Sequence, residues 1–267
     1  MSSSHQLPQA ILIAIILVLS VVNAAEPTNK TVNLCIVPQN DTFTTLVLHH
    51  SVFAKTFYET QFPKLNFNLT ILSRDQNRDS RSMITAVLKK ESCHGIIGPT
   101  FSSSCTRLAP YITLPWISET ASSTALSDKF QFPYFSRVIP SDAAGGLAVA
   151  LLVSQLGFSK INTIGVDEPY SRSVIGAFTQ SFAGQGGTVV KHITIAENSK
   201  QEEVNSAFSQ IVESEVYVTL IVTNSNDEQQ KMMNLAADAT QVNTRHVIFT
   251  SEAWCSTSNI SNIANWP

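Results

Sequence analysis

The sequence predicts an α/β protein built from parallel β-sheets flanked by helices. Short apolar or β-branched runs alternate with helix-length segments almost throughout the chain, and this order is typical of βαβ units. The alternation also runs twice, with a break near residues 138–142. We therefore expect two α/β lobes, the first at 26–140 and the second at 141–267.

Residues 1–25 differ from the rest of the chain and predict a signal peptide. Their apolar core, ILIAIILVLSVV at 11–22, is followed by the small residues Ala24 and Ala25, as at a cleavage site. The core is shorter than the ~20 residues that span a bilayer. No Lys or Arg precedes the core, so the alternative is a signal anchor that stays in the membrane.

The first lobe is expected to hold five strands and three helices. Apolar, β-branched or alternating patterns predict the strands at 31–38, 67–73, 95–98, 114–118 and 134–140. Apolar residues at helical spacing predict the helices at 46–62, 80–90 and near 102–112. The segment between the last two strands is expected to be irregular.

The second lobe repeats this order. Its first helix, at 142–157, is expected to end at Gly157, because glycine readily takes the left-handed conformation that ends a helix. Strands are predicted at 161–166, 188–195, 216–223 and 246–250. Further helices are predicted at 171–186, 201–214 and 227–240.

Composition argues against several functional classes. Charged residues make up 14% of the chain and the net charge is −3, so no basic patch favours nucleic acid as a partner. The six histidines are scattered and no CxxC or HExxH spacing occurs, so we expect neither a metal site nor a cofactor. No activated nucleophile or catalytic pair is recognisable, and we expect that the protein is not an enzyme.

Two further features of the sequence are typical of an exported protein. Four Asn-x-Ser/Thr sequons predict N-glycosylation, at Asn29, Asn40, Asn68 and Asn259. Four cysteines could form disulfides in an oxidising compartment, namely Cys35, Cys93, Cys105 and Cys255. The sequence leaves their pairing open, and Cys35, within a strand-like run, could equally be a buried free thiol.

The stretch GIIGPTFSSS, at 95–104, marks a candidate site. It begins as a buried strand, breaks at Pro99 and ends in a run of serines. Ligands of parallel sheets bind at the carboxyl ends of the strands, where such a run would lie. Clustered hydroxyl groups there could hold a polar group at the strand tip.

Four segments of the chain form a recognisable set. They are, in order, GIIGPTFSSS, LPWISETASSTALSDKFQFPYFSRVIPSDAA, GVDEPYSRSVIGAF and TSEAWCS. In their order and spacing they resemble the extracellular ligand-binding region of class C G-protein-coupled receptors. The resemblance covers roughly residues 31–260 and is closest to metabotropic glutamate and calcium-sensing receptors, within a group that includes GABA-B and natriuretic-peptide receptors. It implies a two-lobed type I periplasmic-binding-protein fold (Venus flytrap).

The resemblance also implies a site for an amino acid between the lobes. Ser102 and Ser103 would hold the ligand carboxylate, with Thr120 and Ser122 beside them. The remaining contacts would act on the ammonium or cover the ligand: Asp142 and Glu252 as carboxylates, and Tyr170 as an aromatic face.

Other roles remain open for these residues. The serines could cap the helix after them, Asp142 could be an N-cap, and Thr120 and Ser122 could be ordinary loop hydroxyls. Tyr170 could pack on the surface, and Glu252 could be a solvated acid. Trp116 and Trp254 are interpreted as packing residues.

The sequence departs from its relatives in two ways. The basic residues that grip acidic ligand side chains in the family are not identifiable. Relatives also continue beyond the position of Pro267, through the rest of both lobes and into a membrane domain, so we expect a C-terminally truncated chain.

We expect a receptor-type ectodomain that binds a small amino-acid-like ligand, signals by lobe closure and pairs with a second subunit. It would lie on the extracellular face of the plasma membrane. The alternative is a secreted binding protein or decoy without a signalling domain. A secreted hydrolase is disfavoured because the chain has no G-x-S-x-G elbow.

Overall fold

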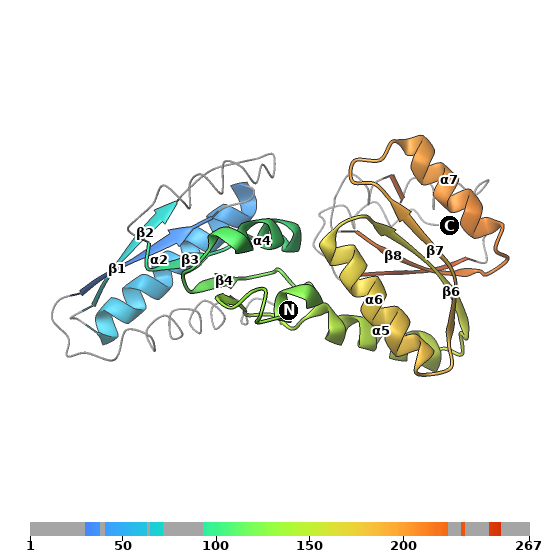
Figure 1. The fold of residues 1–267 in the computed structure, drawn as a ribbon, viewed down its shortest axis with the longest axis horizontal. Coiled ribbons are helices and arrows are strands. Elements are labelled where there is room, and N and C mark those ends of the chain that lie inside the picture. Colours follow the sequence, from blue (N-terminus) through green and yellow to red (C-terminus); the bar gives the residue numbers. More distant parts are fainter. Residues whose placement is uncertain are drawn as a thin grey trace. The chain divides into compact units, whose positions relative to one another are not determined.

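Each half of the chain builds its own parallel β-sheet in the computed structural model (Figure 1). The structure describes residues 30–37, 41–62, 65–71, 93–223, 231–232 and 246–251. The chain divides into two units, Met1–Pro140 and Ser141–Pro267. The predicted signal peptide and the helices expected at 80–90 and 227–240 lie wholly or largely outside the described residues.

The sheet of the first unit has five parallel strands in the order β2-β1-β3-β4-β5. They are β1 (Lys30–Ile36), β2 (Leu65–Ile71), β3 (Gly95–Ile97), β4 (Trp116–Ser118) and β5 (Phe135–Arg137). The predicted parallel arrangement is confirmed. Because all strands run the same way, their carboxyl ends meet at one edge of the sheet.

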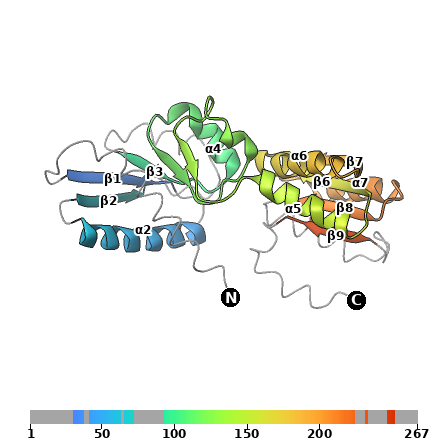
Figure 2. The ribbon, with the colours of Figure 1, turned by 90° about the horizontal axis from the view of Figure 1, so that it is seen from below.

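Helices cover the two faces of this sheet. Figure 2 shows α2 (Asp41–Gln61) running along β1 and β2, where Ala54 and Tyr58 are buried with the apolar strand residues. On the other side, α4 (Ser102–Leu108) and the 3-10 turn Ala109–Tyr111 form the stretch expected as one helix. The irregular segment contains a second 3-10 turn, Thr124–Ser127.

The second unit has a four-stranded parallel sheet in the order β7-β6-β8-β9. The strands are β6 (Lys160–Val166), β7 (Thr188–Ile195), β8 (Val218–Val222) and β9 (Val247–Thr250). The helices are α5 (Asp142–Gln155), α6 (Pro169–Ala183) and α7 (Gln201–Val212).

The strands of this sheet are apolar on both faces, as expected of a parallel sheet between helices. Ile161 packs with α5 and α6 on one face, and Ile164 packs with α7 on the other. The expected end of the first helix is confirmed, since Gly157 has φ +85° and its N–H donates to the carbonyl of Ser154 at 3.0 Å.

A disulfide joins Cys35 of β1 to Cys93, just before β3. The alternative of a free thiol at Cys35 is therefore wrong. Cys105 of α4 is a buried free thiol, and Cys255 lies outside the described residues. The bond links two neighbouring strands across a sequence separation of 58 residues.

Candidate functional site

The carboxyl ends of β3 and β4 bring two predicted site loops together. β3 pairs directly with β4, so the segment after Ile97 lies beside the segment after Ser118. Gly98 makes the first turn with φ +88°, and a Cβ at this position would lie 2.5 Å from the carbonyl oxygen of Val37. Glycine is thus required where the strand passes into the serine-rich loop.

Side-chain hydrogen bonds fasten these two loops to each other. The hydroxyl of Ser118 donates to the carbonyl of Pro99 at 2.6 Å and accepts from the N–H of Ala121 at 3.1 Å. The hydroxyl of Thr120 donates to the carbonyl of Thr100 at 2.6 Å. Thr120 is therefore more than a solvated loop hydroxyl, because it fixes the neighbouring loop.

Ser102 and Ser103 are the first two residues of α4, and both are buried. The N-cap position is occupied by Phe101, which makes no side-chain capping bond, so the interpretation of these serines as N-caps is wrong. The Ser102 hydroxyl oxygen instead accepts from the N–H of Ser123 at 3.1 Å. A serine hydroxyl that accepts one hydrogen bond can also donate one.

Arg137 of β5 supports the second loop. Its Nη1 donates to the carbonyls of Ser122 and Ser123 at 2.8 and 2.7 Å, and its Nη2 bonds the hydroxyl of Ser127. Ser122 is buried, and the hydrogen bond from Arg137 to its carbonyl helps to fix its position. Trp116 packs edge-to-face on Phe135 and donates from its indole to the carbonyl of Gly98, and it is a packing residue as interpreted.

Glu119 was not found by sequence reasoning. It follows β4 directly, and its Oε1 accepts from the hydroxyl of Thr100 at 2.7 Å. Burial raises the pKa of this carboxyl, although the Thr100 bond acts in the opposite direction. A glutamate in a polar loop reads as a solvated surface acid, and no local pattern indicates that it turns inward.

In the second unit, Asp142 is the first residue of α5 and is buried. The residue before it, Ser141, holds the N-cap position, so the interpretation of Asp142 as an N-cap is wrong. A carboxylate in the first turn is favoured by the helix dipole. Its role as an acceptor for a ligand ammonium stays a prediction.

Tyr170 lies in the first turn of α6, beyond the carboxyl end of β6. The carboxylate of Glu168 caps this helix, accepting from the N–H groups of Tyr170 at 2.8 Å and Ser171 at 2.6 Å. The Ser171 hydroxyl donates to the same carboxylate at 2.7 Å. The Tyr170 ring is buried with the apolar cluster under α5 and α6.

Glu168 is the second acid that sequence reasoning missed. It is buried, and burial raises the pKa of its carboxyl against the effect of its three hydrogen bonds. The signal was present, because a carboxylate directly before Pro169 is a helix-start pattern.

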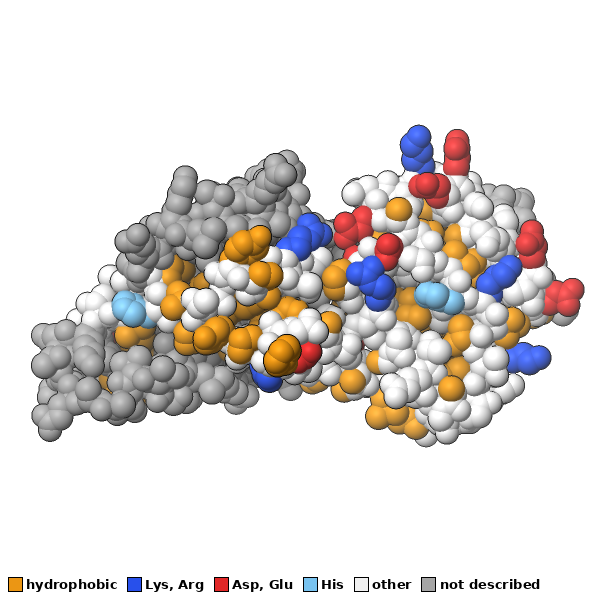
Figure 3. Space-filling model, viewed as in Figure 1, with side chains coloured by type: hydrophobic (Ala, Val, Ile, Leu, Met, Phe, Trp, Pro, Cys, Tyr) orange, Lys and Arg blue, Asp and Glu red, His pale blue; other side chains and the backbone are white. Residues whose placement is uncertain are grey.

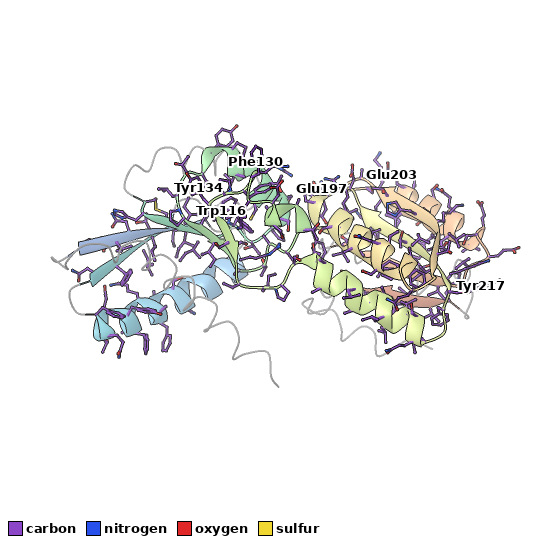
Figure 4. The ribbon with its side chains drawn as sticks, turned by 60° about the horizontal axis from the view of Figure 1, so that its bottom comes forward. Trp116, Phe130, Tyr134, Glu197, Glu203 and Tyr217 are labelled. Carbon is purple, nitrogen blue, oxygen red and sulfur yellow. A yellow bond between two sulfur atoms is a disulfide. The ribbon has the colours of Figure 1, made fainter. Side chains whose placement is uncertain are left out.

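The two ends of the second sheet can be found in Figure 4 by two labelled side chains. Glu197 lies beyond the carboxyl end of β7, and Tyr217 precedes β8, at the opposite end of this unit.

Some predicted residues fall outside the description or are only partly tested. Glu252, Asn29, Asn40 and Asn259 lie outside the described residues. Asn68 lies on β2 with an exposed side chain, and its Nδ2 donates to Asn33 Oδ1 at 3.1 Å. N-glycosylation at these positions stays a prediction.

A family model described as "Receptor family ligand binding region" matches residues 57–265, and the chain belongs to this family. Mouse metabotropic glutamate receptor 4 is 27% identical over 177 residues, 64% of this chain and 19% of that receptor. The G-protein coupled receptor family C group 6 member A of Carassius auratus is 25% identical over 178 residues, 64% of this chain and 20% of the relative. The resemblance to class C receptor ectodomains is thus confirmed.

A solved structure shares the fold. It is the solute binding protein of an ABC transporter from R. palustris, in complex with 4-hydroxybenzoate. The TM-score is 0.69 at 14% identity, over 88% of this chain and 66% of that chain. The predicted periplasmic-binding-protein type of α/β fold is therefore confirmed.

The chain spans about a fifth of the length of the curated receptors it matches. Among the described residues, no helix is both long and apolar enough to cross a membrane. The same residues contain no group of three His, Cys, Asp or Glu side chains that could hold a metal ion.

Proposed function

We propose that this chain binds a small amino-acid-like ligand held by both units, and that lobe closure on the ligand is the signal of a class C type receptor. The observation that carries the proposal is the position of Ser102, Ser103 and Ser122, which follow the carboxyl ends of the paired strands β3 and β4. Thr120 fixes this loop through its bond to the Thr100 carbonyl. Hydroxyl donors suit a carboxylate.

The second unit would supply the groups for the ligand ammonium. Asp142 at the start of α5 and Tyr170 at the start of α6 are the described candidates, and Glu252 is the third. Closure follows if the ligand binds the closed arrangement of the units more tightly than the open one. We infer that the ligand is bound without chemical conversion, because the relatives are receptors.

The protein would act at the extracellular face of the plasma membrane as part of a receptor, with a second subunit as partner. The same module could instead be secreted as a soluble binding protein. Both forms need the same pocket, so one ligand experiment applies to either form.

The test begins with a thermal-shift screen of the twenty amino acids and GABA against the secreted chain. The variant that tests the carboxylate site is Ser103→Ala. Ser102 is not used, because its hydroxyl also accepts from the N–H of Ser123 and its removal would disturb the loop. We expect a loss of affinity of roughly 5- to 12-fold for the best amino acid, about 1–1.5 kcal/mol for one hydrogen bond.

The matched control is Ser209→Ala on α7, whose hydroxyl donates to the carbonyl of Asn205 at an exposed site. It should leave affinity unchanged. If no compound shifts the melting temperature, the proposed binding of an amino acid is wrong. If Ser103→Ala binds as well as the parent, the carboxylate site is not at this loop.

A further inference from the structure

The two site loops of the first unit are joined by four side-chain hydrogen bonds. In order along the second loop, they are Ser118 to Pro99, Glu119 to Thr100, Thr120 to Thr100, and Ser123 to Ser102. We call this set the loop clasp. Three of its bonds use hydroxyl and backbone groups only, so Glu119 is the one member that can gain or lose a proton.

Thr100 takes part in two of the four hydrogen bonds of the loop clasp. Its hydroxyl donates to Glu119 Oε1 at 2.7 Å, and its carbonyl accepts from the Thr120 hydroxyl at 2.6 Å. Thr100 stands two residues before Ser102, at the entry to α4. The bond to Glu119 therefore helps to set where the buried serines lie.

The surroundings of Glu119 favour the neutral carboxyl. Its Oε2 is buried and has no hydrogen-bond partner among the described residues. On the α4 side lies the buried thiol of Cys105, whose pKa is raised by burial and further by Glu119. Arg137 of β5 donates to the carbonyls of Ser122 and Ser123 and to the hydroxyl of Ser127, in the same loop as Glu119.

Ionisation would place a charge on a carboxyl whose Oε2 is buried without a hydrogen-bond partner among the described residues. Such a charge is costly unless water reaches it, and opening the loops would admit water. Burial is the main reason that the pKa of Glu119 is raised, which is the expected result for an acid in this position.

We propose that Glu119 is a proton-controlled positioning residue, which keeps the loop clasp closed when its carboxyl is protonated and releases it on ionisation. This inference rests on the proposed function only in its last step, that the clasp positions Ser102 and Ser103 for a ligand carboxylate. Ligand affinity should therefore be higher at acidic than at alkaline pH.

The direction follows from proton linkage. A carboxyl whose pKa is higher in the closed clasp than in the open one binds its proton more tightly when the clasp is closed. The closed clasp is then favoured below the pKa of the open state and loses stability as pH rises through the raised pKa. Above both values the preference no longer changes with pH.

The experiment measures amide hydrogen exchange in the full secreted chain without ligand, between pH 5 and pH 9, with rates corrected for intrinsic exchange. Peptides covering 98–105 and 116–123 report on the clasp, and a peptide covering 218–222 of the buried strand β8 is the internal reference. Protection of the clasp peptides should fall with pH, by up to about tenfold per unit for one coupled proton. The reference should stay constant.

The deciding variant is Glu119→Gln, which keeps an acceptor for the Thr100 hydroxyl but cannot ionise. Its clasp protection should be independent of pH. Glu202→Gln, at an exposed position on α7, is the matched control and should behave as the parent. A parent chain with pH-independent protection, or a Gln variant with the parent's pH profile, would overturn the proposal.

A second arm uses L-glutamate as the probe, with affinity measured by calorimetry over the same pH range. Parent affinity should fall as pH rises, while the Glu119→Gln profile should lack this decline. Equal declines in both chains would reject the positioning role. Absence of L-glutamate binding would exclude this amino acid as the ligand, and the exchange experiment would then decide the role of Glu119 alone.

Discussion

At the residue scale, the candidate site depends on a position where a side chain cannot fit. Gly98 has φ +88°, and an added Cβ would lie 2.5 Å from a backbone oxygen of Val37. Backbone strain and the overlap together should lower the free energy of unfolding by roughly 2–5 kcal/mol in Gly98→Ala. Urea denaturation followed by circular dichroism measures the change.

The matched control is Gly176→Ala within α6, where an added Cβ meets nothing within 4 Å. This change should be neutral or stabilising, by up to about 1 kcal/mol, because alanine has the better helix propensity. If both variants lose stability equally, the loss reflects the replacement of glycine in general, and the turn after β3 is not constrained as described.

Single residues also show what the sequence could and could not predict. Ser102 and Ser103 were predicted as site residues from hydroxyl groups after a buried strand together with the family resemblance, and Thr120 from the resemblance alone. Glu119 was missed because its burial depends on residues distant in the sequence, such as Thr100. Glu168 was missed although its partners, Tyr170 and Ser171, are local. Helix capping by Ser103 and by Asp142 was excluded only by the structure, since Phe101 and Ser141 occupy the cap positions.

At the scale of elements, the disulfide Cys35–Cys93 connects β1 with the start of β3. The cross-link restricts the unfolded chain across a separation of 58 residues, which should contribute about 2–5 kcal/mol to stability. Cys35→Ala with Cys93→Ala should therefore lower the melting temperature clearly. Reduction of the parent chain should produce a similar loss, and an unchanged melting curve would contradict the cross-link.

The helix α2 presents apolar side chains to solvent. Val52, Phe53 and Phe57 are exposed, although Ala54 and Tyr58 on the opposite face are buried. We expect this face to pair with a second subunit, so Phe53→Lys with Phe57→Lys should reduce the dimer fraction in analytical ultracentrifugation. The melting temperature should not change.

The control for α2 lies elsewhere on the first unit. Figure 3 shows hydrophobic side chains gathered on this unit, and Figure 4 shows Phe130 and Tyr134 there. Phe130 is 96% exposed, so Phe130→Lys alters another apolar site at little structural cost. If Phe130→Lys lowers the dimer fraction and the α2 variant does not, the contact lies on that surface.

The sequence predicted element types better than element limits. The alternation of strand and helix patterns was enough to predict both sheets, because the buried strands of a parallel sheet are apolar along their length. The helix at α2 begins at Asp41, five residues before the expected start, and β5 covers only three of the seven residues expected. Helix ends depend on caps and strand ends on pairing, and neither is visible in periodicity alone.

At the scale of the whole molecule, the remaining question is whether one unit or both bind the ligand. The family and the fold are shared with proteins that bind small molecules, but likeness alone does not assign the contacts. A ligand that binds only the folded state stabilises it by about 2.7 kcal/mol at a concentration of 100 times the dissociation constant, and exchange slows in the unit that the ligand contacts. Each unit can therefore be examined for its own stabilisation.

We expect the best amino acid from the screen to slow hydrogen exchange in both units, at 98–105 in the first and at 166–175 in the second. The first peptide contains Ser102 and Ser103, and the second contains Tyr170. Ser103→Leu should abolish both effects because its larger side chain fills the carboxylate position, whereas Tyr170→Ala should weaken binding without altering the exchange of the first unit in the free state. Protection confined to the first unit would show that the ligand is held there alone, and lobe closure would then have no ligand contact to drive it.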